Sequence, residues 1–308
     1  MTLFEEILAD RVHGASEVEA RLLRTLLQAG PPGPDDLREL TRAVLRHQPS
    51  MANLLTLLND LWLAQDRGEP WEGTIRGRLD RSLEKLDRSF LASLGESLGG
   101  LDRSRPVTLI TLSRSGTVLR ALIAAHQEGV GLRVVVGEGR PGGEGKDTAR
   151  DLAGAGIDTW VAADAALPAL LHEPDTLTLP FKVEIGRTAV VVGTDAVSDA
   201  FFLNKIGTYG LALAAKRAGV PLLLLTNESK LLPPALARSV AVQTGDPAEL
   251  GAPGKALNFY FERVPLNLVS LAILGAGTLR PGELRERAAA LPVSPGLLEE
   301  LAVESPAG

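Results

Sequence analysis

Cysteine is absent from this chain of 308 residues. Its absence excludes disulfide bonds, catalysis by a thiolate and metal sites with cysteine ligands. Histidine occurs four times, at positions that lack the paired spacing of metal ligands. The sequence therefore predicts a protein without a metal.

Long apolar runs and an excess of basic residues are also missing. No stretch reaches the about 18 to 20 apolar residues that a membrane-spanning helix needs. The acidic start, "MTLFEEILADRVHG", lacks the basic and apolar regions of a signal peptide. The net charge of −6 at pH 7 argues against nucleic-acid binding. We expect a cytoplasmic protein that binds neither a membrane nor a nucleic acid.

The first hundred residues carry apolar side chains at helical spacing, broken by proline and glycine. No strand pattern precedes Val107. The expected helices span residues 16–30, 31–47, 50–68 and 74–100. This part of the chain, residues 1–102, is predicted to form a helical N-terminal domain.

After residue 106 short, continuously apolar runs alternate with helical patterns. Continuous apolar strands are typical of a parallel sheet covered on both faces. Residues 103–308 are therefore predicted to form a doubly wound α/β domain, with its ligand at the carboxyl ends of the strands, facing the helical half. The expected strands are residues 107–112, 132–137, 157–162, 188–193 and 220–226, and the expected helices are residues 116–128, 145–155 and 204–218.

The first strand ends in a polar loop, "SRSG", that opens a helix. Two hydroxyls, a guanidinium and the free N–H groups of a helix N-terminus suit a phosphate. Ser113, Arg114, Ser115 and Gly116 are therefore candidate ligand contacts. The alternative is that Ser115 only caps the helix.

The second strand ends in "GEGRPGGEG", which contains G-x-G-x-x-G at Gly137, Gly139 and Gly142. Pro141 occupies the last x, and the helix begins later than a dinucleotide-binding loop requires. We expect no nicotinamide and no other cofactor. Arg140 is a candidate contact for a ligand.

Two further corners carry charged residues. Asp195 lies two residues past a buried strand, where desolvation raises the pKa of a carboxyl and suits it to proton transfer. The alternative is a structural aspartate that caps the turn. Asn204 and Lys205 are expected to open a helix, where a cation opposes the helix dipole. Lys205 therefore predicts an anionic ligand or a nearby carboxylate such as Asp195.

Taken in order, these loops resemble the family of translation initiation factor 2B alpha, beta and delta subunits, which includes methylthioribose-1-phosphate isomerase and ribose-1,5-bisphosphate isomerase. The motifs are "NKIGT", "GEGRPGGEGKDTARDLAGAGI" and "FYFERVPLNLVSLAILGAGTL", with weaker likeness in "HGASEV" and "HQPSMANLL". The resemblance implies a Rossmann-like C-terminal domain, a homodimer and a small phosphorylated metabolite as ligand.

In these isomerases a cysteine and an aspartate move protons between C1 and C2 of an opened sugar phosphate. The resemblance implies that Asp195 is the aspartate, that Asn204 and Lys205 contact the ligand, and that the cysteine position falls on Ser113. The resemblance also implies that His13, which precedes Gly14, and Gln48 stand at the positions of the family's two phosphate-binding arginines.

The replacement of the family cysteine by Ser113 and of the two arginines by His13 and Gln48 leaves three functions open. A thiol titrates near ~8.5 and exchanges protons close to neutral pH, whereas a serine hydroxyl titrates far higher. Ser113 therefore suits holding a ligand better than carrying a proton. The chain is either an aldose–ketose isomerase on a phosphorylated pentose, a non-catalytic binder of a sugar or nucleotide phosphate, or a scaffold. The scaffold would act through a dimer surface at residues 257–261 and 268–277, which can equally be core.

Overall fold

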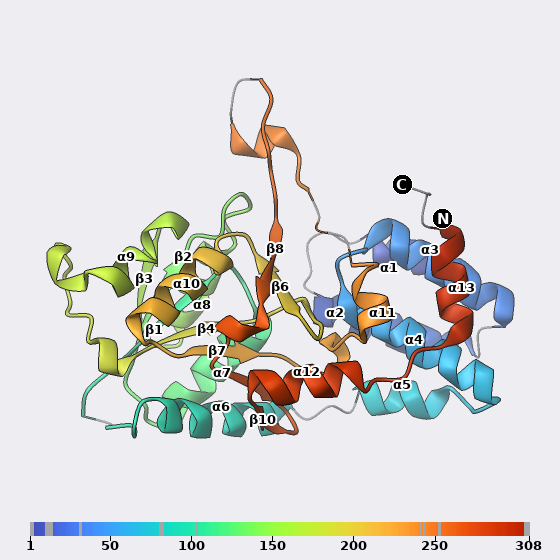
Figure 1. Cartoon of the computed structure of the whole chain (residues 1–308), viewed down its shortest axis with the longest axis horizontal. Coiled ribbons are helices and arrows are strands. Elements are labelled where there is room, and N and C mark those ends of the chain that lie inside the picture. Colours follow the sequence, from blue (N-terminus) through green and yellow to red (C-terminus); the bar gives the residue numbers. More distant parts are fainter. Residues whose placement is uncertain are drawn as a thin grey trace.

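The computed structural model describes residues 3–9, 15–30, 33–79, 83–102, 104–240, 242, 244–251 and 254–304. Figure 1 shows a helical half beside a half built on a sheet, with a segment that projects between them. Within these described ranges, none of the helices has the length and apolar character to cross a membrane.

The helical half is built on α4, which is buried along most of its length and packs against α2, α3 and α13. Its apolar side chains form one core cluster with those of the surrounding helices. The expected helix over residues 74–100 is described as two helices on either side of residues 80–82, which lie outside the described part. The helices up to that point are α1 (Leu3–Leu8), α2 (Ala15–Ala29), α3 (Pro34–His47), α4 (Ala52–Arg67), α5 (Glu72–Leu79) and α6 (Leu83–Ser97).

Helices α6 and α13 each pack on a different half from the helix that precedes them in sequence. Helix α6 places Phe90 and Leu94 in the core beneath the sheet. Helix α13 (Pro295–Glu304) returns to the helical half, where Leu297 joins its core and Glu300 accepts a 2.9 Å hydrogen bond from Arg38 Nε. Figure 1 shows this return after α12 (Pro281–Ala289).

The main sheet has seven strands in the order β10-β9-β7-β4-β1-β2-β3, all parallel except the β9–β10 pair. Every strand expected from the sequence is present. The strands are β1 (Val107–Leu112), β2 (Leu132–Gly137), β3 (Asp158–Ala162), β4 (Thr188–Val192), β7 (Leu222–Leu225), β9 (Leu271–Leu274) and β10 (Gly277–Leu279). The doubly wound α/β fold is thus confirmed.

Helices cover both faces of this sheet. One face packs against α6, α7 (Gly116–Gln127) and α8 (Gly145–Gly154), and the other against α9 (Ala169–His172), α10 (Thr208–Ala218) and α12. Because β1 has β2 on one side and β4 on the other, the chain reverses direction across the sheet at β1. Ligands of such folds bind outside the carboxyl ends of the strands at this point.

A second, antiparallel sheet consists of β5 (Ala196–Val197), β6 (Phe201–Lys205) and β8 (Phe261–Pro265). Its side chains alternate between two cores: Ala196 and Leu203 pack with the helical half, while Val197 and Phe202 pack with the main sheet. Strands β5 and β6 are therefore buried between the two halves, whereas β8 is only partly buried.

The expectation that Asn204 and Lys205 open a helix is wrong. They are the last two residues of β6, where they pair with Glu262 and Phe261 of β8, and α10 begins only at Thr208. Gly207 has φ +99°, a left-handed conformation that separates strand from helix and that glycine adopts readily. The helix dipole is therefore not the reason why Lys205 needs a counter-ion.

The two sequence segments offered as a dimer surface differ in burial. Leu271–Leu274 form β9, and its last three residues are buried in the main sheet. In the other segment, Leu257 is 82% exposed and Phe259 is 42% exposed. They precede β8 in the segment that projects from the body in Figure 1, which also holds the 3-10 helix η5 (Pro247–Leu250).

We predict that Phe90→Ala lowers the free energy of unfolding by about 3–5 kcal/mol, because the fully buried ring is the largest side chain that α6 places under the sheet. Urea denaturation measures the change. Val303→Ala, at a position that is 73% exposed on α13, is the control and should stay within about 0.5 kcal/mol of the unsubstituted chain. A small effect of Phe90→Ala would contradict the packing of α6 on the sheet.

Candidate functional site

Ser113 lies directly after β1, at the carboxyl edge of the main sheet, and is buried. Its φ of +68° is unusual for a residue with a side chain and costs on the order of 1–3 kcal/mol. The conformation is held by two hydrogen bonds: Ser113 Oγ donates to Glu144 Oε1 (3.0 Å), and the Ser113 carbonyl accepts from Thr148 Oγ1 (3.1 Å). The strand end is thereby tied to the start of α8.

The loop from Gly137 to Gly145 holds Glu144 in this position. A Cβ atom on Gly145 would lie 1.9 Å from the carbonyl oxygen of Gly137, so no other residue fits there without a backbone shift. The carboxylate of Asp164 accepts the N–H groups of Gly139 (2.9 Å) and Arg140 (2.7 Å). Glu144 precedes α8, but its side chain does not cap the helix.

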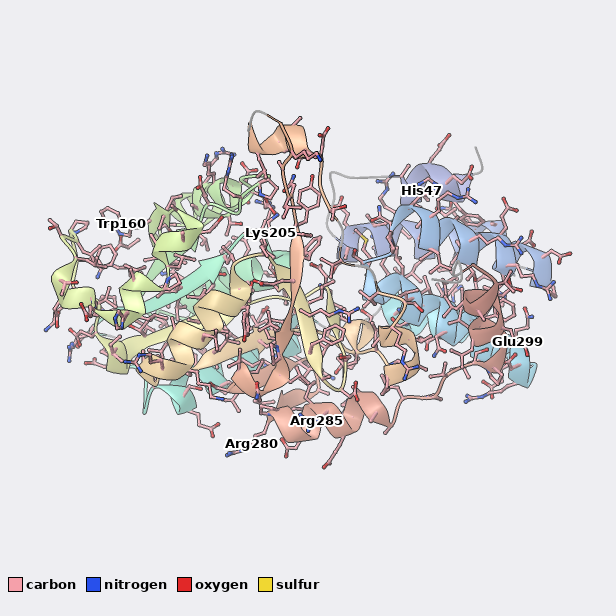
Figure 2. The ribbon with its side chains drawn as sticks, turned by 45° about the horizontal axis from the view of Figure 1, so that its top comes forward. His47, Trp160, Lys205, Arg280, Arg285 and Glu299 are labelled. Atoms are coloured by element: carbon pink, nitrogen blue, oxygen red, sulfur yellow. The ribbon has the colours of Figure 1, made fainter. Side chains whose placement is uncertain are left out.

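Lys205 is the partner of Glu144 across the site. The two form an ion pair in which the lysine side chain is 6% exposed and the glutamate side chain 30% exposed. The Lys205 ammonium also lies 5.4 Å from the ring centre of Tyr260, within the range of a cation–π interaction. Figure 2 shows Lys205 near the middle of the molecule, between Trp160 of the sheet half and Glu299 of α13. The carboxylate that pairs with this lysine is thus Glu144.

Asn204 belongs to the turn between β6 and α10. Its amide Nδ2 donates to Thr208 Oγ1 (3.0 Å), and that hydroxyl donates to the Lys205 carbonyl (2.6 Å). Because side chains alternate along a strand, Asn204 lies on the opposite face of β6 from Lys205. Lys205 shares its face with Leu203, which packs with the helical half.

Asp195 lies beyond β4, in the turn to the small sheet. Its N–H donates to the Leu203 carbonyl (2.9 Å), and its carbonyl accepts from the N–H of Ala52, the first residue of α4 (3.3 Å). Burial raises the pKa of the Asp195 carboxyl, although the ammonium groups of Lys230 and Lys205 lower it. Desolvation therefore outweighs the two ammonium groups.

Lys230 ends the short helix η4 (Glu228–Lys230) after β7 and is buried. Its ammonium donates to the carbonyl oxygen of Thr194 (2.6 Å), next to Asp195. The preceding residue, Ser229, accepts a hydrogen bond from Thr56 Oγ1 of α4. Helix α4 thus borders both Asp195 and Lys230.

The other predicted contacts lie outside this cluster. Arg114 pairs with Asp151 of α8 (2.9 Å), and its side chain is exposed. Ser115 Oγ accepts from the N–H of Val118 (3.4 Å) and so caps α7, as its alternative interpretation expects. Arg140 and Gly116 are exposed.

The predicted residues of the helical half are only partly described. Gln48 is buried at the end of α3, where its Nε2 donates to the Leu8 carbonyl (2.7 Å). His13 and Gly14 lie outside the described residues. The structure therefore joins Ser113 and Lys205 through Glu144, with Asp195 acted on by Lys205 and Lys230.

Sequence reasoning missed Glu144 and Lys230. Glu144 stands at the end of a glycine-rich loop, and the glycine pattern of that loop indicates a nucleotide-binding turn rather than a functional carboxylate. Lys230 follows an apolar strand by five residues, and the rule that ligands gather at strand ends could have found it.

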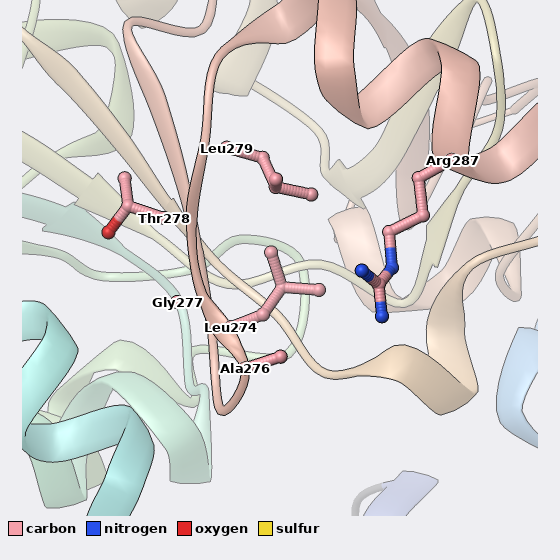
Figure 3. A pocket seen from close by; sticks show the side chains of 6 residues that line it. All are labelled: Leu274, Ala276, Gly277, Thr278, Leu279 and Arg287. Atoms are coloured by element: carbon pink, nitrogen blue, oxygen red, sulfur yellow. The ribbon is translucent and has the colours of Figure 1, made fainter.

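Two cavities in the described part of the chain lie elsewhere. One, of about 50 Å³, lies between the β9–β10 hairpin and α12; Figure 3 shows Leu274 and Leu279 facing Arg287 there. It has room for about one or two water molecules. A second, of about 400 Å³, is lined by residues of the 174–183 loop. None of the described predicted site residues lines either cavity. Nor does the described part of the chain contain a cluster of three histidine or carboxylate side chains that could hold a metal ion.

Comparison with known proteins gives one family. The sequence model of the initiation factor 2 subunit family (IF-2B) matches residues 104–281. The chain is similar to ribose 1,5-bisphosphate isomerase of Archaeoglobus fulgidus, with 25% identity over 294 residues that cover 90% of this chain and 88% of the relative. It is similar to methylthioribose-1-phosphate isomerase of Desulforudis audaxviator, with 34% identity over 279 residues that cover 82% of this chain and 76% of the relative.

Solved structures are also similar to this chain. Translation initiation factor eIF-2B of Pyrococcus horikoshii matches with a TM-score of 0.65 and 25% identity, covering 90% of this chain and 95% of that one. A chain of the tetrameric eIF2B-beta2-delta2 complex from C. thermophilum shares the fold, with a TM-score of 0.64 and 18% identity, covering 93% and 92%. The resemblance inferred from the motifs is confirmed.

We predict that Asp195→Asn raises the melting temperature at pH 7. The pKa of Asp195 is above its ordinary 3.8 in the folded chain, so the folded state binds the proton more tightly than the unfolded state and loses stability once the carboxyl ionises. The gain should shrink as pH falls through the folded-state pKa towards 3.8. Calorimetry over a pH series measures it.

Asp102→Asn is the control of opposite sign, since hydrogen bonds from Ser104 lower the pKa of Asp102. That variant should be less stable than the unsubstituted chain at pH 7. A loss of stability in Asp195→Asn at pH 7 would contradict the dominance of desolvation at this carboxyl.

Proposed function

Because the chain belongs to the initiation factor 2 subunit family, we propose that it binds a phosphorylated sugar or nucleotide at the carboxyl ends of β1, β4 and β7, against helix α4. The relatives named above support a pentose phosphate as the ligand class, since their names give ribose 1,5-bisphosphate and methylthioribose 1-phosphate. The observation that carries the proposal is the Ser113–Glu144–Lys205 chain of contacts beside Asp195.

Each member of the cluster has a chemical role in this proposal. Lys230 supplies positive charge for a phosphate, Lys205 holds the Glu144 carboxylate, and Ser113 supplies a hydrogen bond that orients the sugar. Asn204, on the opposite face of β6 from Lys205, keeps its hydrogen bond to Thr208. Glu144 is the partly exposed member of the ion pair, so the ligand reaches the buried lysines past its carboxylate. Arg114 contacts the phosphate only if its ion pair with Asp151 breaks.

The reaction proposed for this site is aldose–ketose isomerisation. Asp195 as carboxylate takes the proton from C2 of the opened sugar while water donates a proton to the C1 carbonyl oxygen, so that a C1–C2 enediol forms. Water then takes the proton of the C2 hydroxyl and Asp195 returns its proton to C1, which gives the ketose. A raised pKa suits a carboxyl that takes and returns a proton near neutral pH. Ser113 polarises and positions the sugar.

A second candidate is a binding protein without turnover. Ser113 stands where the isomerases of the family have a cysteine, and a hydroxyl does not readily carry a proton at neutral pH. The Gln48 amide, at the position of a family arginine, bonds to the Leu8 carbonyl instead. Both observations favour retention of a phosphorylated ligand over its conversion.

Binding and turnover are measured separately. We expect a pentose phosphate at about 100 times its Kd to stabilise the chain by ~2.7 kcal/mol in a thermal-shift assay. For an isomerase, Asp195→Asn reduces kcat by about 100-fold or more and leaves the thermal shift largely intact.

The exposed Asp175 offers the control variant Asp175→Asn, which should keep both binding and turnover. Unchanged turnover in Asp195→Asn would remove the catalytic assignment. A thermal shift without turnover in the unsubstituted chain would favour the binding protein. No shift with any phosphorylated metabolite would reject both.

The protein is also proposed to form a homodimer. The exposed apolar side chains of Leu257 and Phe259 favour a surface that a second subunit covers, and such a surface is the basis for the alternative function as a scaffold. We expect light scattering to give the mass of a dimer at micromolar concentration, and Leu257→Asp to weaken the dimer by about tenfold or more. A monomer under these conditions would exclude both the homodimer and the scaffold.

A further inference from the structure

Glu144 is a charged residue inside the proposed site that the reaction does not use. We infer that it determines which ligands the site accepts: by neutralising Lys205 it selects a sugar with a single phosphate group and disfavours one with two. This inference rests on the proposed binding function and narrows its ligand class.

The first step is the charge balance of the cluster. Lys205 and Lys230 are both buried, but their partners differ. The Lys230 ammonium donates to a neutral carbonyl, that of Thr194, and the carboxyl that acts on it is Asp195. Because burial raises the pKa of Asp195, a proton on this carboxyl leaves the positive charge of Lys230 for a ligand. Lys205 is paired with the carboxylate of Glu144, so its charge is already compensated within the protein.

The second step is the fixed position of Glu144. Its Oε1 atom accepts from both Ser113 Oγ and Lys205, and the backbone around it leaves no room for a side chain at Gly145. The pair is mostly withdrawn from water, where charge interactions are screened less than at the surface. The Glu144 side chain therefore stays beside Lys205 when the ligand enters.

The third step is the effect on a ligand. A carboxylate accepts hydrogen bonds from sugar hydroxyls, so the Glu144 side of the site suits the polyol part of a sugar. A phosphate dianion at the same place meets a like charge that is held in position. One phosphate is thus accommodated at Lys230, and a second is disfavoured at Lys205.

Calorimetric titration with ribose 5-phosphate and with ribose 1,5-bisphosphate tests this. The unsubstituted chain should bind the monophosphate about tenfold tighter or more, equivalent to 1.4 kcal/mol. Glu144→Gln keeps the shape and a hydrogen-bond acceptor but releases the charge of Lys205, so the preference should vanish or reverse. Asp147→Asn removes a carboxylate from the first turn of the same helix, where it pairs with exposed Arg150, and should keep the original preference.

A Glu144→Gln variant with an unchanged preference would overturn the inference. So would an unsubstituted chain that binds the bisphosphate as tightly as the monophosphate; that result needs no variant and leaves the proposed binding function standing. Glu144→Asp, which retains the charge, should still favour the monophosphate, and loss of that preference would also count against the inference. Binding of neither compound by any of these chains would reject the inference and the proposed function together.

Discussion

The burial of β6 on both faces is the constraint from which the site follows. This strand lies between the helical half and the main sheet, with Leu203 directed to one core and Phe202 to the other. Strand β6 therefore carries Lys205 into a place with little water, where an unpaired ammonium would be costly. Glu144 supplies the missing charge, and Ser113 shares the same carboxylate oxygen.

Close backbone packing keeps the loops of the site in fixed positions. Gly193, directly after β4, leaves room for Ser115: a Cβ atom there would lie 2.3 Å from the serine hydroxyl oxygen. Gly145 does the same for the carbonyl of Gly137. At Gly193 the absence of a side chain lets the segments after β4 and β1 approach each other, and at Gly145 it lets the start of α8 approach the end of β2.

The sequence indicated the parts of the fold that local pattern determines. The strands β1, β4 and β7 were recognisable because they are continuously apolar, and Ser113 and Asp195 were recognisable because they follow such strands. Strand β6 was missed, since its apolar residues merge with the helical spacing of α10 and only Gly207 marks the break. The partnership of Glu144 with Lys205 joins loops distant in sequence, and no local spacing could reveal it. The alternative role of Ser115 as a helix cap was visible in the sequence and corresponds to the observed hydrogen bond.

The exchange of α6 and α13 between the halves has a consequence for how the molecule unfolds. Helix α6 completes the core under the sheet, and α13 completes the core of the helices, so each half depends on a helix that is preceded in sequence by a helix of the other half. Unfolding of either half would remove a helix from the other half and expose the apolar core of that half to water. The two halves are thus expected to lose their structure in a single cooperative transition, as interlocked parts of one folding unit.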